Sequence, residues 1–218
     1  MLWFKRDLRW HDHAPLASAA LWAQTSGARV LPLWVYEPDM WSQSDMAPQH
    51  LAFANECLSE LGDWVASSKG ELCRMHGDIT DVLDALFNAL GRFVLVSHEE
   101  TGNGWSYARD LAVGQWCRTQ AVEWREFPSN GVVRRLQSHG GGRNRWSQHK
   151  AARMQAPALA PPGNVPWLTL PPSVADDLAA RGLLCGTLSP HDMGMTGGDI
   201  KINDVAGRKA GGRAAPLG

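Results

Sequence analysis

Four charged side chains follow a short apolar run at the start of this 218-residue chain. The opening "LWFKRDLRW" places Lys5, Arg6, Asp7 and Arg9 directly after residues 2–4. Cationic groups at such a point could hold an anionic or carbonyl-rich ligand, and arginine offers a planar fork of donors that lysine lacks. Alternatively, Asp7 pairs with one of the arginines and fastens the loop without any ligand. We expect this fastening role for Asp7 and Arg9, and both interpretations stay open.

A second group, in "HEETGNGW", follows the apolar run 92–97 and contains His98, Glu99 and Glu100. Its carboxylates could accept hydrogen bonds from a ring N–H or a ribose hydroxyl, or could cap the helix that follows. The pattern is not His-Glu-x-x-His, because no second histidine follows at the required spacing. We therefore expect no metal site here.

The sequence lacks three motifs that mark common nucleotide-binding and catalytic sites. It contains neither the phosphate loop Gly-x-x-x-x-Gly-Lys-Ser/Thr, nor Gly-x-Gly-x-x-Gly after the first strand, nor Gly-x-Ser-x-Gly. The four cysteines form no Cys-x-x-Cys pair, which indicates neither a zinc site nor a disulfide framework. We expect no catalytic residue and no bound metal.

Apolar runs alternate with amphipathic stretches up to about residue 127, which is typical of a parallel sheet with crossover helices. The fold class that we predict is α/β, a doubly wound, Rossmann-like sheet of five parallel strands in the order 3-2-1-4-5. In this order the ligand site lies at the carboxyl ends of strands one and four, where both charged groups are found. The expected strands are 2–4, 29–36, 71–76, 92–97 and 121–127.

Helices are expected from capping residues and from apolar side chains at three- and four-residue steps. Asp12 and Asp78 are the expected caps of the first and third helices, and the second helix is expected over 48–67. A fourth helix is expected over 105–119. Its predicted inward face consists of Ala108, Leu111, Ala112 and Trp116.

The periodic pattern ends near residue 128. We predict three parts: an α/β domain over 1–128, an irregular, extended linker over 129–205, and the start of a further domain over 206–218. Basic residues between 134 and 153 could touch phosphate, although the Gly- and Pro-rich composition favours a connector. No apolar run approaches the length of a membrane span, and no signal peptide is recognisable, so we expect a cytoplasmic protein.

Several segments resemble the DNA photolyase and cryptochrome family. "LWFKRDLRWHDHAPLASAA" is similar to its first strand, loop and helix, and "VLPLWVYEPDMW" to its second strand. Arg109 and Asp110 in "YARDLAVGQWC" fall where the family has an Arg-Asp pair, and "NGVVRRL" is similar to its loop after strand five. "GRKAGGRAA", residues 207–215, resembles the start of the family's helical flavin domain, so we expect a chain truncated before that domain.

The resemblance implies the N-terminal antenna domain of a flavin-dependent photolyase or blue-light receptor. In the family, FAD in the helical domain drives repair of pyrimidine dimers, and a folate, deazaflavin or FMN antenna passes excitation to it. DNA would be bound by the helical domain, and this chain alone would not bind DNA specifically. The family activity, deoxyribodipyrimidine photolyase, is not assigned to this chain alone.

The resemblance also suggests which residues form the antenna cleft and which serve structural salt bridges. Folate-binding members carry Asn-Glu ahead of the Arg-Asp pair, where this chain has Trp105 and Ser106. Alternatives are a stand-alone nucleotide- or chromophore-binding module and a truncated product without activity. The expected salt-bridge residues are Asp7, Arg9, Arg109 and Asp110, and the expected cleft residues are Lys5, Arg6, Val35, Tyr36, Glu37, His98, Glu99, Glu100 and Trp105.

Overall fold

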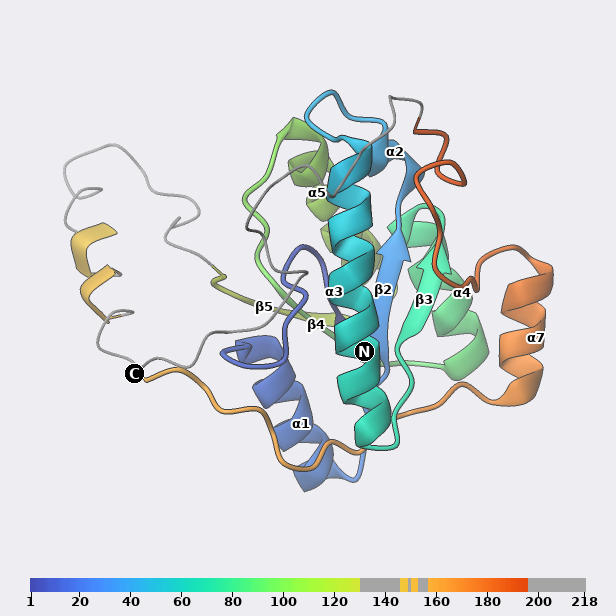
Figure 1. The fold of residues 1–218 in the computed structure, drawn as a ribbon. Helices are drawn as coiled ribbons and strands as arrows, with labels where there is room; N and C mark the ends of the chain where they lie inside the picture. The colour runs from blue at the N-terminus through green and yellow to red at the C-terminus, as the bar shows by residue number, and fades with distance from the viewer. Residues whose placement is uncertain (130–145, 149, 153–156, 196–218) are drawn as a thin grey trace.

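Five parallel strands form one sheet at the centre of the molecule (Figure 1). The structure is a computed structural model and describes residues 1–129, 146–148, 150–152 and 157–195. The strand order is β3-β2-β1-β4-β5, which confirms the predicted doubly wound topology. The strands are β1 (Leu2–Trp3), β2 (Pro32–Tyr36), β3 (Cys73–His76), β4 (Val94–His98) and β5 (Glu123–Phe127).

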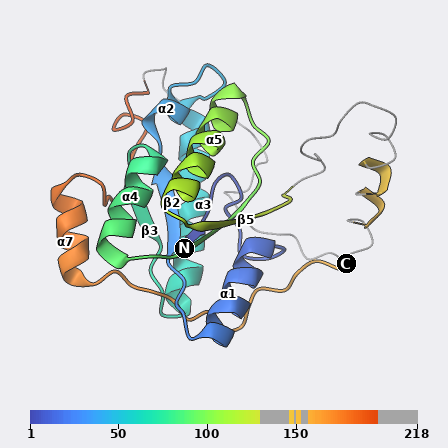
Figure 2. The ribbon, with the colours of Figure 1, turned by 180° about the vertical axis from the view of Figure 1, so that it is seen from behind.

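Helices cover both faces of the sheet. One face carries α1 (Ala14–Ser26) and α3 (Pro48–Ser67), seen from the front in Figure 1. The opposite face carries α4 (Ile79–Leu90) and α5 (Gly104–Thr119), seen in Figure 2. A single turn, α2 (Pro38–Trp41), follows β2 directly. Every residue of the central strands β1 and β2 is buried, because both faces are covered.

The helix caps agree only in part with the expected ones. Asp78 caps α4, and its side chain accepts a hydrogen bond from the Thr80 amide, as predicted. The prediction for α1 was wrong, because His13 and not Asp12 is its N-cap. Nδ1 of His13 accepts the Leu16 amide at 3.0 Å, whereas Asp12 has a positive φ of 47° in the preceding turn.

The predicted inward face of α5 was wrong except at Trp116, which packs against the core. Ala108, Leu111 and Ala112 are exposed, and Leu111 keeps 56% of its surface accessible. The buried side of this helix carries instead Ser106, Arg109, Asp110, Val113 and Cys117. The helix therefore turns a different side inward than predicted, because the side chains of Arg109 and Asp110 are buried in ion pairs.

The segment 157–195 packs against the α/β domain. Residues 172–180, which we expected to be irregular, form the helix α7 (Pro172–Ala180). Trp167 is buried against α3 and bonds Ser68, and Val30 forms a parallel bridge with Trp167. Further on, the Cys185 amide bonds the Arg74 carbonyl at 3.0 Å, so this segment covers the outer edge of β3.

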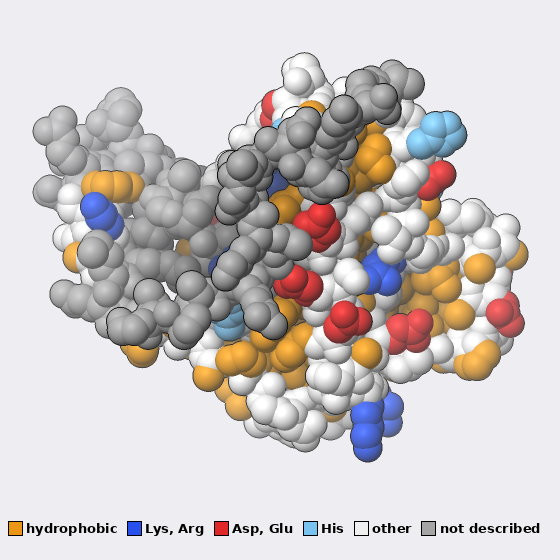
Figure 3. Space-filling view, viewed as in Figure 1, with side chains coloured by type: hydrophobic (Ala, Val, Ile, Leu, Met, Phe, Trp, Pro, Cys, Tyr) orange, Lys and Arg blue, Asp and Glu red, His pale blue; other side chains and the backbone are white. Residues whose placement is uncertain are grey.

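Some predictions fall outside the described residues or stay untested. The segments 130–136 and 206–218, which carry part of the family resemblance, are not described. Among the described residues, no helix is long and apolar enough to cross a membrane. Leu21 on α1 and Phe53 on α3 are exposed, and Figure 3 shows hydrophobic side chains at the surface of this face.

Candidate functional site

The loops after β1 and β4 lie together at the carboxyl ends of the strands. They line a cavity of about 140 Å³ between them, which includes Lys5, Arg6, Arg9, His98 and Glu100. The sheet order brings them together, because β1 and β4 are neighbours although about 90 residues separate them in the sequence. The structure therefore places both groups of charged residues at one site.

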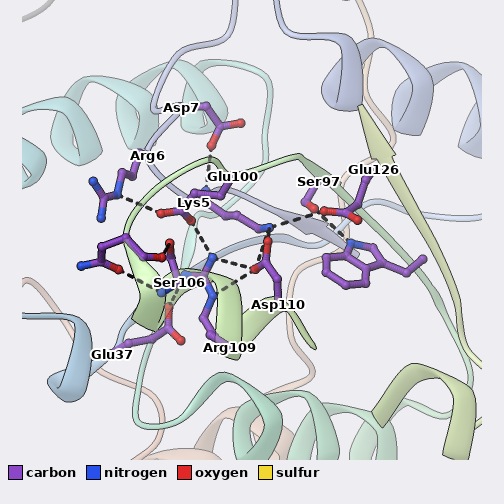
Figure 4. A network of polar contacts seen from close by, with 12 residues as sticks. Lys5, Arg6, Asp7, Glu37, Ser97, Glu100, Ser106, Arg109, Asp110 and Glu126 are labelled. Atoms are coloured by element: carbon purple, nitrogen blue, oxygen red, sulfur yellow. Dashed lines mark hydrogen bonds and ion pairs between the residues drawn. The ribbon is translucent and has the colours of Figure 1, made fainter. Parts of the chain in front are cut away.

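Lys5 is buried in an ion pair with α5. Its Nζ atom lies 3.2 Å from Oδ1 of Asp110 and 4.5 Å from the centroid of the Trp3 ring. Burial lowers the pKa of Lys5, and the Asp110 carboxylate opposes this change. The whole side chain is committed to internal contacts, so Lys5 anchors the loop rather than reaching into solvent (Figure 4).

Arg109 is the centre of a second buried group (Figure 4). Its Nη1 lies 3.0 Å from Oε2 of Glu37, and its Nη2 contacts both Glu100, at 2.5 Å, and Asp110. Burial disfavours its charge, but the three carboxylates outweigh this effect and raise the pKa of Arg109. The guanidinium fork thus joins the end of β2 to the loop after β4.

Glu37 has only half of its carboxylate satisfied. Oε1 is buried without a hydrogen-bond partner among the described residues. Glu37 is one of the residues that line a small pocket of about 10 Å³, beside Arg6 and Trp34. Burial raises the pKa of Glu37 to about 7, and Arg109 only partly opposes this shift.

Asp7 holds two histidines. Nε2 of His13 and Nδ1 of His98 lie 2.8 and 2.5 Å from its Oδ2 atom, while Oδ1 accepts the Lys5 amide at 2.8 Å. Burial disfavours the charge of Asp7, but the two adjacent histidines outweigh this effect and hold its pKa well below the ordinary value. The expected partner of Asp7 was Arg6 or Arg9, and this expectation was wrong.

The same three residues could be read as metal ligands, since their ligand atoms lie within 4.8 Å of one another. However, Nδ1 of His13 accepts the amide of Leu16, so a neutral ring carries its proton on Nε2. That nitrogen lies 2.8 Å from Oδ2 of Asp7 without the alignment of a hydrogen bond, and it has no lone pair for a metal ion. The three side chains form a compact polar cluster that ties α1 and β4 to the loop after β1.

A larger cavity, of about 470 Å³, opens on the other side of the β1 loop. Arg6, Asp7 and Arg9 line both cavities and separate them. The walls are largely apolar and come from the end of β2, from α2 and from α3. They include Leu8, Trp34, Met40, Trp41, Met46, Phe53 and Ala54.

Two indole N–H groups beside this cavity have no hydrogen-bond partner in the part of the chain that the structure describes. Trp34 and Trp41 are 3% and 5% exposed, and neither Nε1 atom has a hydrogen-bond partner among the described residues. A buried N–H without an acceptor costs free energy, and most such groups in proteins are paired. Aromatic side chains at its walls make this cavity suited to a flat ligand.

The expected cleft residues divide into two groups. Arg6 lines both cavities, and His98, Glu99 and Glu100 line the smaller one. Val35 and Tyr36 are core residues, and the Tyr36 hydroxyl bonds Asn55 at 2.7 Å. Trp105 lies against Arg109, and the Cζ atom of Arg109 is 5.4 Å from the centroid of the Trp105 ring.

The salt-bridge residues also differ in their contacts. Arg109 and Asp110 form the ion pairs described above. Arg9 bonds the Asp12 carbonyl oxygen, with Nη2 at 3.1 Å, rather than a carboxylate.

Sequence reasoning missed the walls of the larger cavity. Four residues of α3 line this cavity and follow one another at steps of three, one and three residues: His50, Phe53, Ala54 and Cys57. This stripe lies beside the core stripe of Leu51, Leu58, Leu61 and Val65. A second apolar stripe on a helix next to the switch point was the signal that could have revealed them.

Residues 1–156 match the family model for DNA photolyase. A deoxyribodipyrimidine photo-lyase of Salmonella typhimurium is 41% identical over 61 residues, which are 28% of this chain and 12% of that protein. The matched part is thus a small share of this curated relative's length.

Solved structures share the fold. A cryptochrome of Synechocystis superposes with a TM-score of 0.61 at 16% identity, covering 79% of this chain and 39% of that one. A Sulfolobus tokodaii photolyase, solved with two FAD molecules, gives 0.57 at 17% identity, covering 82% and 40%. Because the family model covers well over half of the sequence, this chain belongs to the DNA photolyase family.

Proposed function

We propose that this chain is the α/β domain of a photolyase or cryptochrome and binds a flat, light-absorbing cofactor in the larger cavity. The observation that carries the proposal is the cavity of about 470 Å³ between the β1 loop, the end of β2, α2 and α3, which is lined by the aromatic rings of Trp34, Trp41 and Phe53. Its volume is within the range of about 300–1,000 Å³ that is usual for small-molecule sites. Members of the family repair DNA or sense light, and both activities start with light absorption.

The residues of this domain would bind and orient the cofactor and exclude water from it. Phe53, Met40 and Met46 supply apolar surface for a ring, and Arg6 and Arg9 line the wall shared with the smaller cavity. The cofactor would absorb light and pass the excitation to FAD. Energy transfer depends on position and orientation, so this domain needs no acid, base or nucleophile.

The buried ion pairs would fix the shape of the site. Lys5 with Asp110 and Arg109 with Glu37 connect α5 to the ends of β1 and β2. The Sulfolobus tokodaii photolyase was solved with two FAD molecules, which imply a novel light-harvesting cofactor in that protein. The same fold in this chain supports a cofactor at the corresponding domain.

In this proposal FAD and DNA are bound by a helical domain of the family and not by the α/β domain. The domain limits stay a proposal: 1–128 for the α/β domain, 129–205 for the connection and 206–218 for the start of the helical domain. In this proposal the light-harvesting group is a folate, a deazaflavin or a flavin nucleotide.

Purification without added cofactor tests the proposal. The chain is purified, and its visible spectrum is recorded. A band beyond the aromatic absorption of the protein, from a compound that mass spectrometry identifies after extraction, is the expected result. A chain that stays colourless after incubation with flavins, deazaflavin and folates would contradict the proposal. In a light-driven dimer repair assay, the chain alone should be inactive.

A further inference from the structure

Among the described residues, the outer edge of β5 is not paired with another strand. The sheet has β3 and β5 at its two edges, and the segment 157–195 covers β3 (Figure 1). The carbonyl oxygen of Phe127 accepts the Glu99 amide, so the backbone polar groups of residues 123, 125 and 127 face β4. Successive residues of a strand alternate, and the N–H and C=O groups of Trp124 therefore point outward. An edge of this kind is a template for a further strand.

The helix α5 exposes apolar side chains next to this edge. Tyr107 and Leu111 keep 68% and 56% of their surface accessible. They share one side of the helix with Gly114, where a Cβ atom would lie 3.8 Å from the ring of Trp124 on β5. The other side of α5 packs against α4 through Trp116. The two exposed side chains are therefore on the side of α5 that faces the β5 edge.

The helix α1 contributes an aromatic ring on the opposite face of the sheet. Trp22 is 38% exposed, and the Cζ atom of Arg125 on β5 lies 5.7 Å from the centroid of its ring. Apolar surface thus lies beside the β5 edge on both faces of the sheet. Exposed apolar side chains that gather beside an open edge are typical of an interaction surface.

The charges of β5 are complementary to a second copy of the same strand. Glu123 and Arg125 share one face of β5, with Nε of Arg125 2.7 Å from Oε1 of Glu123. An antiparallel copy related by a twofold axis at Trp124 would place Glu123 opposite the partner's Arg125, and the reverse pair would form by symmetry. The outward N–H and C=O groups of the two Trp124 residues would then bond each other. An axis at residue 123 or 125 would instead place like charges opposite each other, which is destabilising.

We propose that this chain forms a twofold-symmetric homodimer through β5, in which the sheets of the two copies join edge to edge. Such an interface uses the same surface twice, as the Glu123 and Arg125 pairs require. Trp22 on one face and Tyr107 with Leu111 on the other would cover the join. The dimer does not depend on the proposed cofactor.

Sedimentation of the purified chain over a range of concentrations tests the dimer. The parent should pass from monomer to dimer as its concentration rises. Glu123→Arg and Arg125→Glu should each weaken the dimer about tenfold, because two symmetry-related pairs become repulsive. An equal mixture of these two variants should dimerise like the parent, since every pair again joins opposite charges. Asp176→Arg, at an exposed position of α7 on the far side of the sheet, is the matched control.

Hydrogen exchange at the Trp124 amide provides a second measurement. Its protection should rise with protein concentration, in step with the dimer. Protection that is the same at every dilution would overturn the proposal, because another part of the same chain would then cover β5. A parent that stays monomeric would also overturn it, as would a dimer that both charge reversals leave unchanged or a mixture that does not restore it.

Discussion

Oε2 of Glu37 lies 3.0 Å from Nη1 of Arg109, whereas Oε1 of the same carboxylate is buried without a partner among the described residues. Arg109 comes from α5 and Glu37 from the end of β2. The pair therefore links the two sides of the switch point, and its unsatisfied half makes the site sensitive to pH.

The first prediction concerns the pH dependence of stability. The pKa of Glu37 is about 7 in the fold and about 4.5 when unfolded, so the folded state binds this proton more tightly. The free energy of unfolding should therefore fall as pH rises from about 4.5 to about 7, by about 3 kcal/mol from this group. Glu37→Gln should remove this contribution in urea unfolding at several pH values. Glu60→Gln on α3 is the control, and an unchanged slope in Glu37→Gln would refute the prediction.

The second prediction concerns the carboxylate that holds two histidines. Asp7→Asn replaces a buried acceptor of His13 and His98 by an amide that cannot satisfy both. Since a buried polar group that loses its partner costs about 1–3 kcal/mol, we expect a loss of this size in the free energy of unfolding. Asp63→Asn, at an exposed position of α3, should change it little. Equal stabilities of the two variants would show that the cluster contributes nothing.

The third prediction tests how the segment 157–195 is docked. A Cβ atom at Gly70 would lie 2.5 Å from the ring of Trp167, which is buried and bonds Ser68. Gly70→Ala should therefore lower the melting temperature and expose residues 165–168 to hydrogen exchange. Gly163→Ala meets no atom within 4 Å and serves as the control. Parent-like protection in Gly70→Ala would mean that Trp167 does not pack at this position.

The sheet was predictable because its signals are local and consistent. Short apolar strands that alternate with capped helices leave few topologies, and the right-handed crossover rule reduces these further. The helix over 48–67 and the Asp78 cap followed from periodicity and capping chemistry alone. The switch point then located the charged loops after β1 and β4 correctly.

The errors have a common physical origin in buried polar contacts. The inward face of α5 carries Arg109 and Asp110, and an apolar stripe cannot reveal a helix face that is buried through ion pairs. His13 caps α1 because its other ring nitrogen is held by Asp7, a contact between loop and helix that spacing does not show. The larger cavity depends on where α2 and α3 meet the β1 loop, which only the packing determines.

The central claim is that a flat cofactor occupies the cavity between the β1 loop and α3, and a blocked cavity tests it most directly. Ala54 lines this cavity, whereas Ala66 is exposed on the same helix, so Ala54→Trp and Ala66→Trp form a matched pair. Riboflavin titrations followed by fluorescence should show binding to the parent and to Ala66→Trp and its loss in Ala54→Trp. Riboflavin that binds Ala54→Trp as tightly as the parent would contradict the account, because the ring would then bind elsewhere.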